Sequence, residues 1–102
     1  METFGEIIKQ AREQNALLLR HVAAEMDMDQ AIVSKIERGE RKPSKEQVIR
    51  FSKFYKLDEE KLLIAWLSDK VAYEIQDEDC AQKVLKVAEK KVKYLQENTK
   101  YR

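Results

Sequence analysis

Glycine, proline and cysteine are all scarce in this sequence of 102 residues, which contains two Gly, one Pro and one Cys. No Asn-Gly or Asp-Gly dipeptide joins two alternating apolar runs, which argues against a protein built from β-hairpins. Leu, Ala, Glu, Lys and Gln, all good helix formers, are abundant instead. We therefore expect an all-α protein, long enough for one compact domain plus an appendage.

The few residues suited to metal or redox chemistry do not form a site. Cys80 is the only cysteine, so no intrachain disulfide can form, and His21 is the only histidine. Neither has partners at the spacing of a metal site or a catalytic triad, and no glycine-rich phosphate loop occurs. We expect no enzyme, no metal and no cofactor, with His21 on the surface of a helix. A redox role for Cys80 is an alternative that its acidic neighbours disfavour.

Long apolar runs are also missing. The longest, residues 62–67, is far too short to cross a bilayer, and the first residues lack the order of a signal peptide. Together with the single cysteine, these absences predict a cytoplasmic protein that has no membrane partner.

Charge of one sign does not dominate, because 20 Lys and Arg nearly balance 19 Asp and Glu. The distribution is uneven, however. Residues 58–80 carry eight acidic and two basic side chains, whereas residues 82–102 carry seven basic and two acidic ones. Such runs are either solvated helix faces or surfaces for dimer pairing or phosphate contact, and both interpretations stay open.

Helix-start motifs and spaced apolar residues predict six helices. Thr3 with Glu6, and Ser44 with Gln47, have the form of capping boxes, and Gly39 suits the left-handed position after a helix. Apolar residues recur at spacings of three and four, which predicts helices at about 4–15, 18–26, 29–38, 44–55, 59–75 and from 81 onward.

The second and third of these helices fit a helix-turn-helix over residues 19–36. Asp27 and Met28 form a short connection, and Asp tolerates left-handed backbone better than most residues. Ala23 supplies a small side chain where the two helices would touch. The positions expected to face the core are apolar: Val22, Met26, Met28, Val33 and Ile36.

The sequence Ser34-x-Ile36-Glu37-x-Gly39, with Arg12, Pro43 and Leu62-Leu63, resembles the Cro/C1-type (Xre-like) helix-turn-helix family over residues 4–63. The resemblance implies a five-helix lambda-repressor-like DNA-binding domain, residues 1–67, with an additional C-terminal helix. Residues 68–102 are then a helical extension for dimerisation. It also implies an ion pair between Arg12 and Glu37, in which each side chain would be stranded without the other.

The family's base-reading positions fall on Gln30, Ala31, Ser34 and Lys35. Gln suits adenine, Ala a thymine methyl group and Lys guanine, while Ser can serve a base or a phosphate. The alternative is that they are ordinary exposed helix residues. Basic side chains and helix N-termini nearby predict the phosphate contacts, which are Arg20, Arg38, Arg41, Lys42, Ser44 and Lys45.

Four positions depart from the family pattern. Leu18-Leu19 replaces the usual Ser-Gln pair at the start of the second helix, which removes a capping hydroxyl and a phosphate-contacting amide. Asp27 and Lys56 stand where glycine is common. These changes affect the contact geometry rather than the fold.

A single module of this kind reads only about half a turn of DNA, so we expect a homodimer on double-stranded DNA. Its expected interface is Trp66, Leu67, Ala81, Leu85, Ala88, Val92 and Leu95. The resemblance implies a transcriptional repressor or autoregulator that binds a palindromic operator. The alternatives are an antitoxin or adaptor that grips a protein partner encoded nearby, and a structural or RNA-binding helical module.

Overall fold

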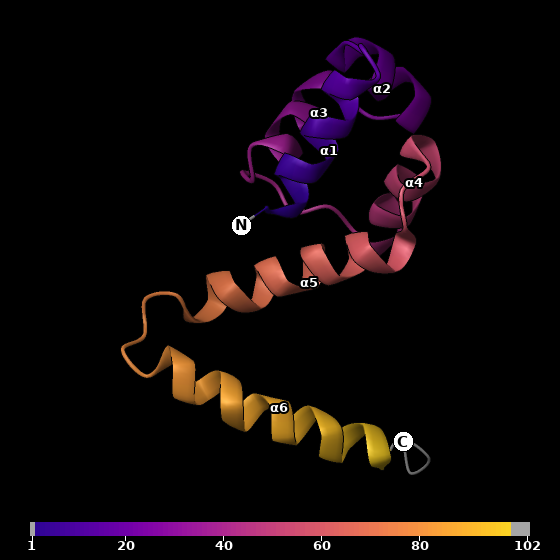
Figure 1. The fold of residues 1–102 in the computed structure, drawn as a ribbon. Coiled ribbons are helices and arrows are strands. Elements are labelled where there is room, and N and C mark those ends of the chain that lie inside the picture. Colours follow the sequence, from indigo (N-terminus) through magenta and orange to yellow (C-terminus); the bar gives the residue numbers. More distant parts are fainter. Residues whose placement is uncertain (1, 99–102) are drawn as a thin grey trace. The chain divides into compact units, whose positions relative to one another are not determined.

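The computed structural model describes residues 2–98, and within them it contains six α-helices and no strand (Figure 1). The all-α prediction is therefore confirmed. The helices are α1 (Phe4–Gln14), α2 (Leu19–Met26), α3 (Gln30–Glu37), α4 (Lys45–Tyr55), α5 (Glu59–Ile75) and α6 (Ala81–Glu97).

The chain forms two compact units, and the boundary between them follows Lys70, inside α5. The first unit holds α1 to α4 and most of α5, and the second begins at Val71 and holds α6. The sequence predicts that the DNA-binding domain ends at residue 67 and that residues 68–102 form an extension for dimerisation. This functional division remains a prediction.

The two predicted capping boxes form to different extents. At α4, Ser44 Oγ accepts from the Gln47 backbone N–H at 3.2 Å, and Gln47 Oε1 accepts from the Ser44 N–H at 3.0 Å. At α1, Thr3 Oγ1 accepts from the Glu6 N–H at 3.2 Å, but the Glu6 carboxylate instead accepts from the Thr3 hydroxyl at 3.3 Å. Only the α4 box is therefore reciprocal.

Left-handed residues end several helices. Gly39 has φ 76° at the end of α3, where the sequence predicts this conformation. Asp27 adopts φ 53° at the turn after α2, and Lys56 adopts φ 55° after α4. Ala16 also has φ 53°, which nothing in the sequence signals, because alanine has no local preference for this region.

The core of the first unit is formed by apolar side chains from one face of each of the helices α1 to α5. Ile8, Val22, Val33, Val48 and Phe51 have no exposed surface. Fully burying one such side chain contributes about 1.5–3 kcal/mol. The other members are Phe4, Ala11, Ala23, Met26, Ile36, Tyr55, Leu62 and Trp66.

Gly5 brings α1 against the end of α3. A Cβ atom at this position would lie 2.5 Å from the backbone carbonyl oxygens of both Ile36 and Glu37. Backbone atoms cannot withdraw from such a contact as a flexible side chain can. Glycine is therefore required here by the close approach of two helices.

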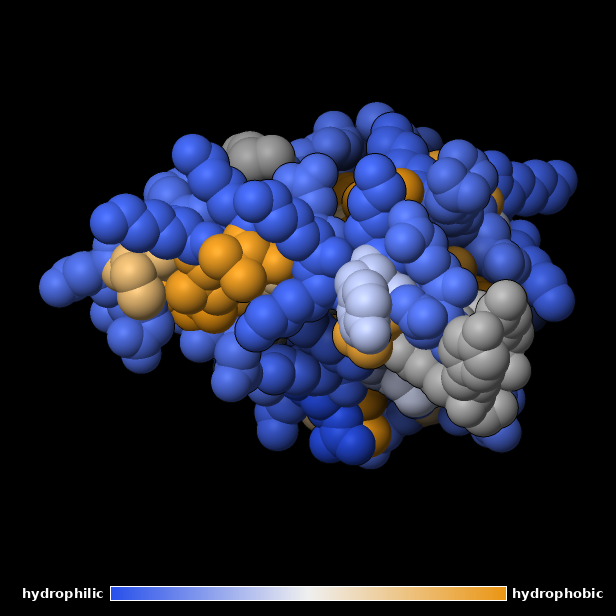
Figure 2. Space-filling view, turned by 90° about the horizontal axis from the view of Figure 1, so that it is seen from below, coloured by the Kyte–Doolittle hydropathy of each residue, from blue (hydrophilic) through white to orange (hydrophobic). Residues whose placement is uncertain are grey.

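The second unit has little buried surface of its own. None of the α6 residues, all of which the structure describes, is buried. The large exposed apolar residues of this unit are Val71, Tyr73, Val84, Leu85, Val87, Val92, Tyr94 and Leu95. A space-filling view shows apolar surface gathered among hydrophilic side chains on one face of the molecule (Figure 2).

Candidate nucleic-acid interface

Helices α2 and α3 form a rigid bracket. The Met28 N–H donates to the Ala23 carbonyl at 2.9 Å across the turn, and Ala23 is 5% exposed where the helices meet. Asp29 caps α3 by accepting from the Ala31 N–H at 2.8 Å. The five residues predicted to face the core do so: Val22, Met26, Val33 and Ile36 are buried, and Met28 is half-buried and packs against the core. The direction of α3 is thus fixed by its neighbours.

One face of α3 is left open to solvent. Gln30, Ala31 and Lys35 are exposed, and Ser34 beside them is half-buried. These positions lie on one side of the helix, because Val33, Ile36 and Glu37 occupy the opposite, buried side. An exposed helix face with amide, methyl, hydroxyl and ammonium groups can reach base edges in a major groove.

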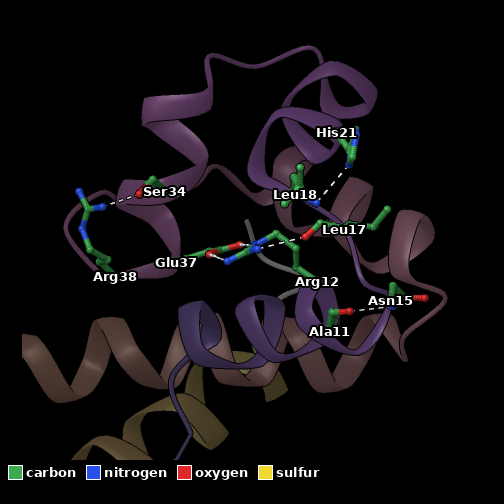
Figure 3. Close-up of polar contacts among 9 residues, drawn as sticks. All are labelled: Ala11, Arg12, Asn15, Leu17, Leu18, His21, Ser34, Glu37 and Arg38. Atoms are coloured by element: carbon green, nitrogen blue, oxygen red, sulfur yellow. Dashed lines mark hydrogen bonds and ion pairs between the residues drawn. The ribbon is translucent and has the colours of Figure 1, made fainter.

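Ser34 and Arg38 are joined in the free protein. Arg38 Nη1 donates to Ser34 Oγ, and Arg38 Nε donates to the Glu40 carboxylate (Figure 3 shows the first contact). The hydrogen bond to Glu40 raises the pKa of Arg38, and Arg38 in turn lowers the pKa of Glu40. The guanidinium is therefore held over the last turn of α3.

A cationic rim follows α3. Arg41, Lys42, Ser44 and Lys45 are exposed between α3 and the start of α4. Within residues 2–98, no ion pair occupies Arg41, Lys42 or Lys45, so their charges are free to meet phosphates. In the α4 capping box, the Ser44 hydroxyl oxygen accepts one hydrogen bond and the Ser44 backbone N–H donates another. The hydroxyl proton of Ser44 can therefore still donate to a phosphate.

Arg12 and Glu37 form a bidentate ion pair that ties α1 to the end of α3 (Figure 3). Arg12 Nε lies 2.8 Å from Glu37 Oε2, and Nη2 lies 3.1 Å from Oε1. The side chains are 14% and 4% exposed, respectively. Arg12 Nη1 also donates to the Leu17 carbonyl at 3.1 Å. The hydrogen bond to Glu37 raises the pKa of Arg12.

His21 has a role that the sequence does not reveal. Its Nδ1 accepts from the Leu18 backbone N–H at 3.1 Å, which is the returning half of a capping box (Figure 3). The Leu18 side chain has no acceptor, so the other half, normally made by serine, is missing. His21 thus partly replaces the lost cap at the start of α2, where exposed Arg20 also lies.

Arg50 is a second positioning residue absent from the sequence-based predictions. Its Nη2 donates to the Met26 carbonyl at 2.7 Å, at the C-terminal end of α2. A cation at this end satisfies an unpaired carbonyl and is favoured by the helix dipole. No local pattern announces the contact, because the two residues come from different helices.

Tyr55 brings an unpaired hydroxyl close to the Arg12–Glu37 pair. Among the described residues its buried hydroxyl finds no hydrogen-bond partner. Burial raises the pKa of the Tyr55 phenol, and the nearby Glu37 carboxylate raises it further. Its ring packs against Phe51 and Phe54, with centroids 6.3 and 4.8 Å away.

The residues expected at a dimer interface fall into two groups. Trp66 is buried in the first unit, 8% exposed, and its Nε1 donates to the Pro43 carbonyl at 3.0 Å. It is a core residue of the first unit, and its place in a dimer interface stays a prediction. Leu67, Leu85, Val92 and Leu95 are between 40% and 51% exposed. Ala81 and Ala88 are half-buried.

Residues 2–98 contain neither a cluster of metal ligands nor a membrane-spanning helix. No cluster of three His, Cys, Asp or Glu side chains there could hold a metal ion. No helix in this part of the chain has the length and apolar character needed to cross a membrane.

The comparisons with known proteins agree with this geometry. A family model described as helix-turn-helix matches residues 8–62, which is more than half of the chain. The matched range contains the α2–α3 bracket and the cationic rim. No curated protein and no solved structure matches the chain.

Proposed function

The chain belongs to the Cro/C1-type helix-turn-helix family of DNA-binding regulators, and we propose that it is a transcriptional repressor or autoregulator that binds a palindromic operator as a homodimer. The observation that carries this proposal is the solvent-exposed face of α3. The opposite face of this helix is packed into the core, and the cationic rim, whose basic side chains have no ion-pair partner among the described residues, follows it in the sequence.

In this proposal α3 enters the major groove and Gln30 and Lys35 read base edges. Gln30 lies at the first position of α3, where its amide can both donate to and accept from adenine. Lys35, one turn later, can donate to guanine, and Ala31 can contact a thymine methyl group. Ser34 needs to exchange its contact with Arg38 for one with DNA.

The rim would supply affinity without sequence information. Arg41, Lys42 and Lys45 contact phosphates directly, and Ser44 adds a hydroxyl donor beside the N-terminus of α4. Arg20 does the same at the start of α2. Arg38 joins them when DNA phosphates displace Glu40. Such contacts set the register and produce the salt dependence of binding.

Dimerisation would follow from the apolar face of the second unit. Leu85, Val92 and Leu95 expose about half of their surface, with Ala81 and Ala88 along the same stripe. The chain carries an acidic segment at residues 58–80 and a basic one from residue 82 onward. A second copy therefore offers both apolar surface and complementary charge. Leu67, on α5 in the first unit, is a further exposed apolar residue.

The decisive experiment selects bound fragments from random duplex DNA, sequences them, and then compares two variants on the selected operator. Lys35→Ala is expected to relax the preference at one base position by about 1–3 kcal/mol. Lys42→Ala is expected to weaken binding to all sequences and to reduce the salt slope by about one. Lys9→Ala, an exposed lysine on α1, is the control and leaves both unchanged.

Identical profiles for Lys35→Ala and Lys42→Ala would contradict these roles. Equal affinity for selected and random duplexes would overturn the operator-binding function and revive a structural or RNA-binding module.

The second candidate is an antitoxin or adaptor that uses the same helix-turn-helix for operon autoregulation. The observation that favours it is the uncovered apolar face of α6, which a different protein could also cover. A chain that stays monomeric alone, but forms a complex of defined stoichiometry with the product of a neighbouring reading frame, would select this function over the homodimer.

A further inference from the structure

One side chain of α5 reaches the first residue of α1. The Phe4 backbone N–H donates to Asp69 Oδ2 at 2.8 Å, across 65 residues of sequence. The first N–H groups of a helix have no partner within the helix, and the helix dipole makes this end favourable for a carboxylate. Asp69 is half-buried there, near the end of the first unit.

A second contact, made by Trp66, ties the same stretch of α5 to the rest of the first unit, and a third lies within α5 itself. Trp66 is buried and its Nε1 donates to the Pro43 carbonyl, just before α4. Lys70 Nζ lies 3.7 Å from the centroid of the Trp66 ring, a cation–π geometry. The last turn of α5 within the first unit is thus held both by α1 and by the segment before α4.

We propose that Asp69 is a positioning residue that sets the direction in which α5 leaves the DNA-reading unit and thereby sets the spacing of operator half-sites. This inference rests on the proposed homodimer. In a dimer joined beyond Val71, the separation of the two α3 helices depends on the direction of α5. Asp69, which accepts from the Phe4 N–H, lies one residue before the end of the first unit.

The part of α5 that extends from the core is long enough for a small tilt to change the separation of the two reading helices. Leu62, at the centre of the core, and Ile75, at the end of α5, are separated by about 20 Å of helix. A tilt of about 10° about Leu62 would move the far end by about 3.4 Å, which is about the rise of one base pair. Loss of the contact at Asp69 therefore lets the distance between half-sites vary by about one base pair, which weakens the preference for one spacing.

The chain offers a matched pair of variants. Asp69→Ala removes the acceptor, while Asp69→Asn keeps one oxygen of the same reach, removes the charge and replaces the second oxygen by an amide NH2. If Asp69 acts through its hydrogen bond to Phe4, the Asn variant retains the wild-type direction of α5 and the Ala variant does not. A thermal melt of each variant shows that both are folded before they are compared.

The first measurement uses no DNA. A spin label is placed at Glu25→Cys, an exposed site on α2, in a Cys80→Ser background. Pulsed dipolar spectroscopy then gives the distance between the two reading units of a dimer. We expect one narrow distance for wild type and Asp69→Asn, and a broadened or shifted one for Asp69→Ala.

The second measurement compares affinities for operators whose half-site spacing differs by one base pair. The wild-type preference, about tenfold, should fall below about threefold in Asp69→Ala only.

The outcomes separate the two hypotheses. Unchanged distances and spacing profiles in Asp69→Ala, with dimer and operator binding intact, would overturn the role of Asp69 alone. Absence of any intermolecular dipolar signal in the wild type would overturn the homodimer and the inference with it. A broadened distance in both Asp69→Ala and Asp69→Asn would show that charge, not the hydrogen bond, holds α5.

Discussion

Among single residues, Arg12 and Glu37 form the ion pair that ties the reading helix to the body of the domain. Glu37 is buried in the last turn of α3, where the helix dipole disfavours a carboxylate. The arginine fork supplies both hydrogen bonds that make this position tolerable, at 2.8 and 3.1 Å.

Arg12→Ala should lower the free energy of unfolding by about 3 kcal/mol, because it strands a buried carboxylate. Lys9→Ala, an exposed change on the same helix, should alter it by less than about 0.5 kcal/mol. Arg12→Lys should fall between them, because it keeps the charge without the fork. Urea unfolding of the three variants measures this, and equal midpoints for Arg12→Ala and Lys9→Ala would rule out the structural role of the pair.

Tyr55→Phe should stabilise the protein by about 1 kcal/mol, because it removes a buried hydroxyl without a partner and keeps the ring contacts. The raised pKa of the Tyr55 phenol adds a pH dependence. Near pH 10 the phenol of the unfolded chain ionises while the folded one stays neutral. The free energy of unfolding of wild type should therefore fall as the pH rises above about 10.

This alkaline fall should be smaller in Tyr55→Phe. Urea midpoints measured from pH 8 to pH 11 test both statements, and Tyr73→Phe, at an exposed tyrosine, serves as the control. A loss of stability in Tyr55→Phe at pH 8 would show that the hydroxyl has a partner in solution.

At the scale of elements, the helix boundaries separate what local sequence encodes from what packing imposes. The starts at Thr3 and Ser44 and the stop at Gly39 follow from residue types, and the sequence predicts them. Ala16 adopts a left-handed conformation just after α1, where the Leu17 N–H donates to the Arg12 carbonyl at 3.0 Å, as in a Schellman cap. Glycine would suit that position better.

Ala16→Gly should therefore stabilise the protein by about 1 kcal/mol, because it relieves the steric cost of a Cβ at positive φ. Ala24→Gly, at an exposed position inside α2, should destabilise it by about 1 kcal/mol. The same substitution thus gives opposite signs at the two sites. Thermal melts would refute the argument if both variants shifted the melting temperature in one direction.

At the scale of the whole molecule, the second unit decides whether one reading unit or two meet the operator. Val92→Glu places a charge in the centre of the exposed α6 stripe, and it should convert a dimer into a monomer at tens of micromolar. Lys93→Glu, an exposed neighbour off the stripe, is the control. Light scattering gives the mass, and a wild-type monomer at this concentration would contradict the proposed homodimer.

The helices, the helix-turn-helix and the family follow from the amino-acid sequence alone, because they depend on residue periodicity, caps and a motif confined to neighbouring residues. Most of the exposed side chains on α3 and the rim could be named for the same reason. Tertiary structure decided the contacts between distant segments. Trp66 is buried and bonds to the Pro43 carbonyl, and Gly5 lets α1 pack closely against the end of α3. Arg50 caps the C-terminal end of α2, and Asp69 accepts from the first N–H of α1. Each depends on how helices cross in three dimensions, and no local pattern carries that information.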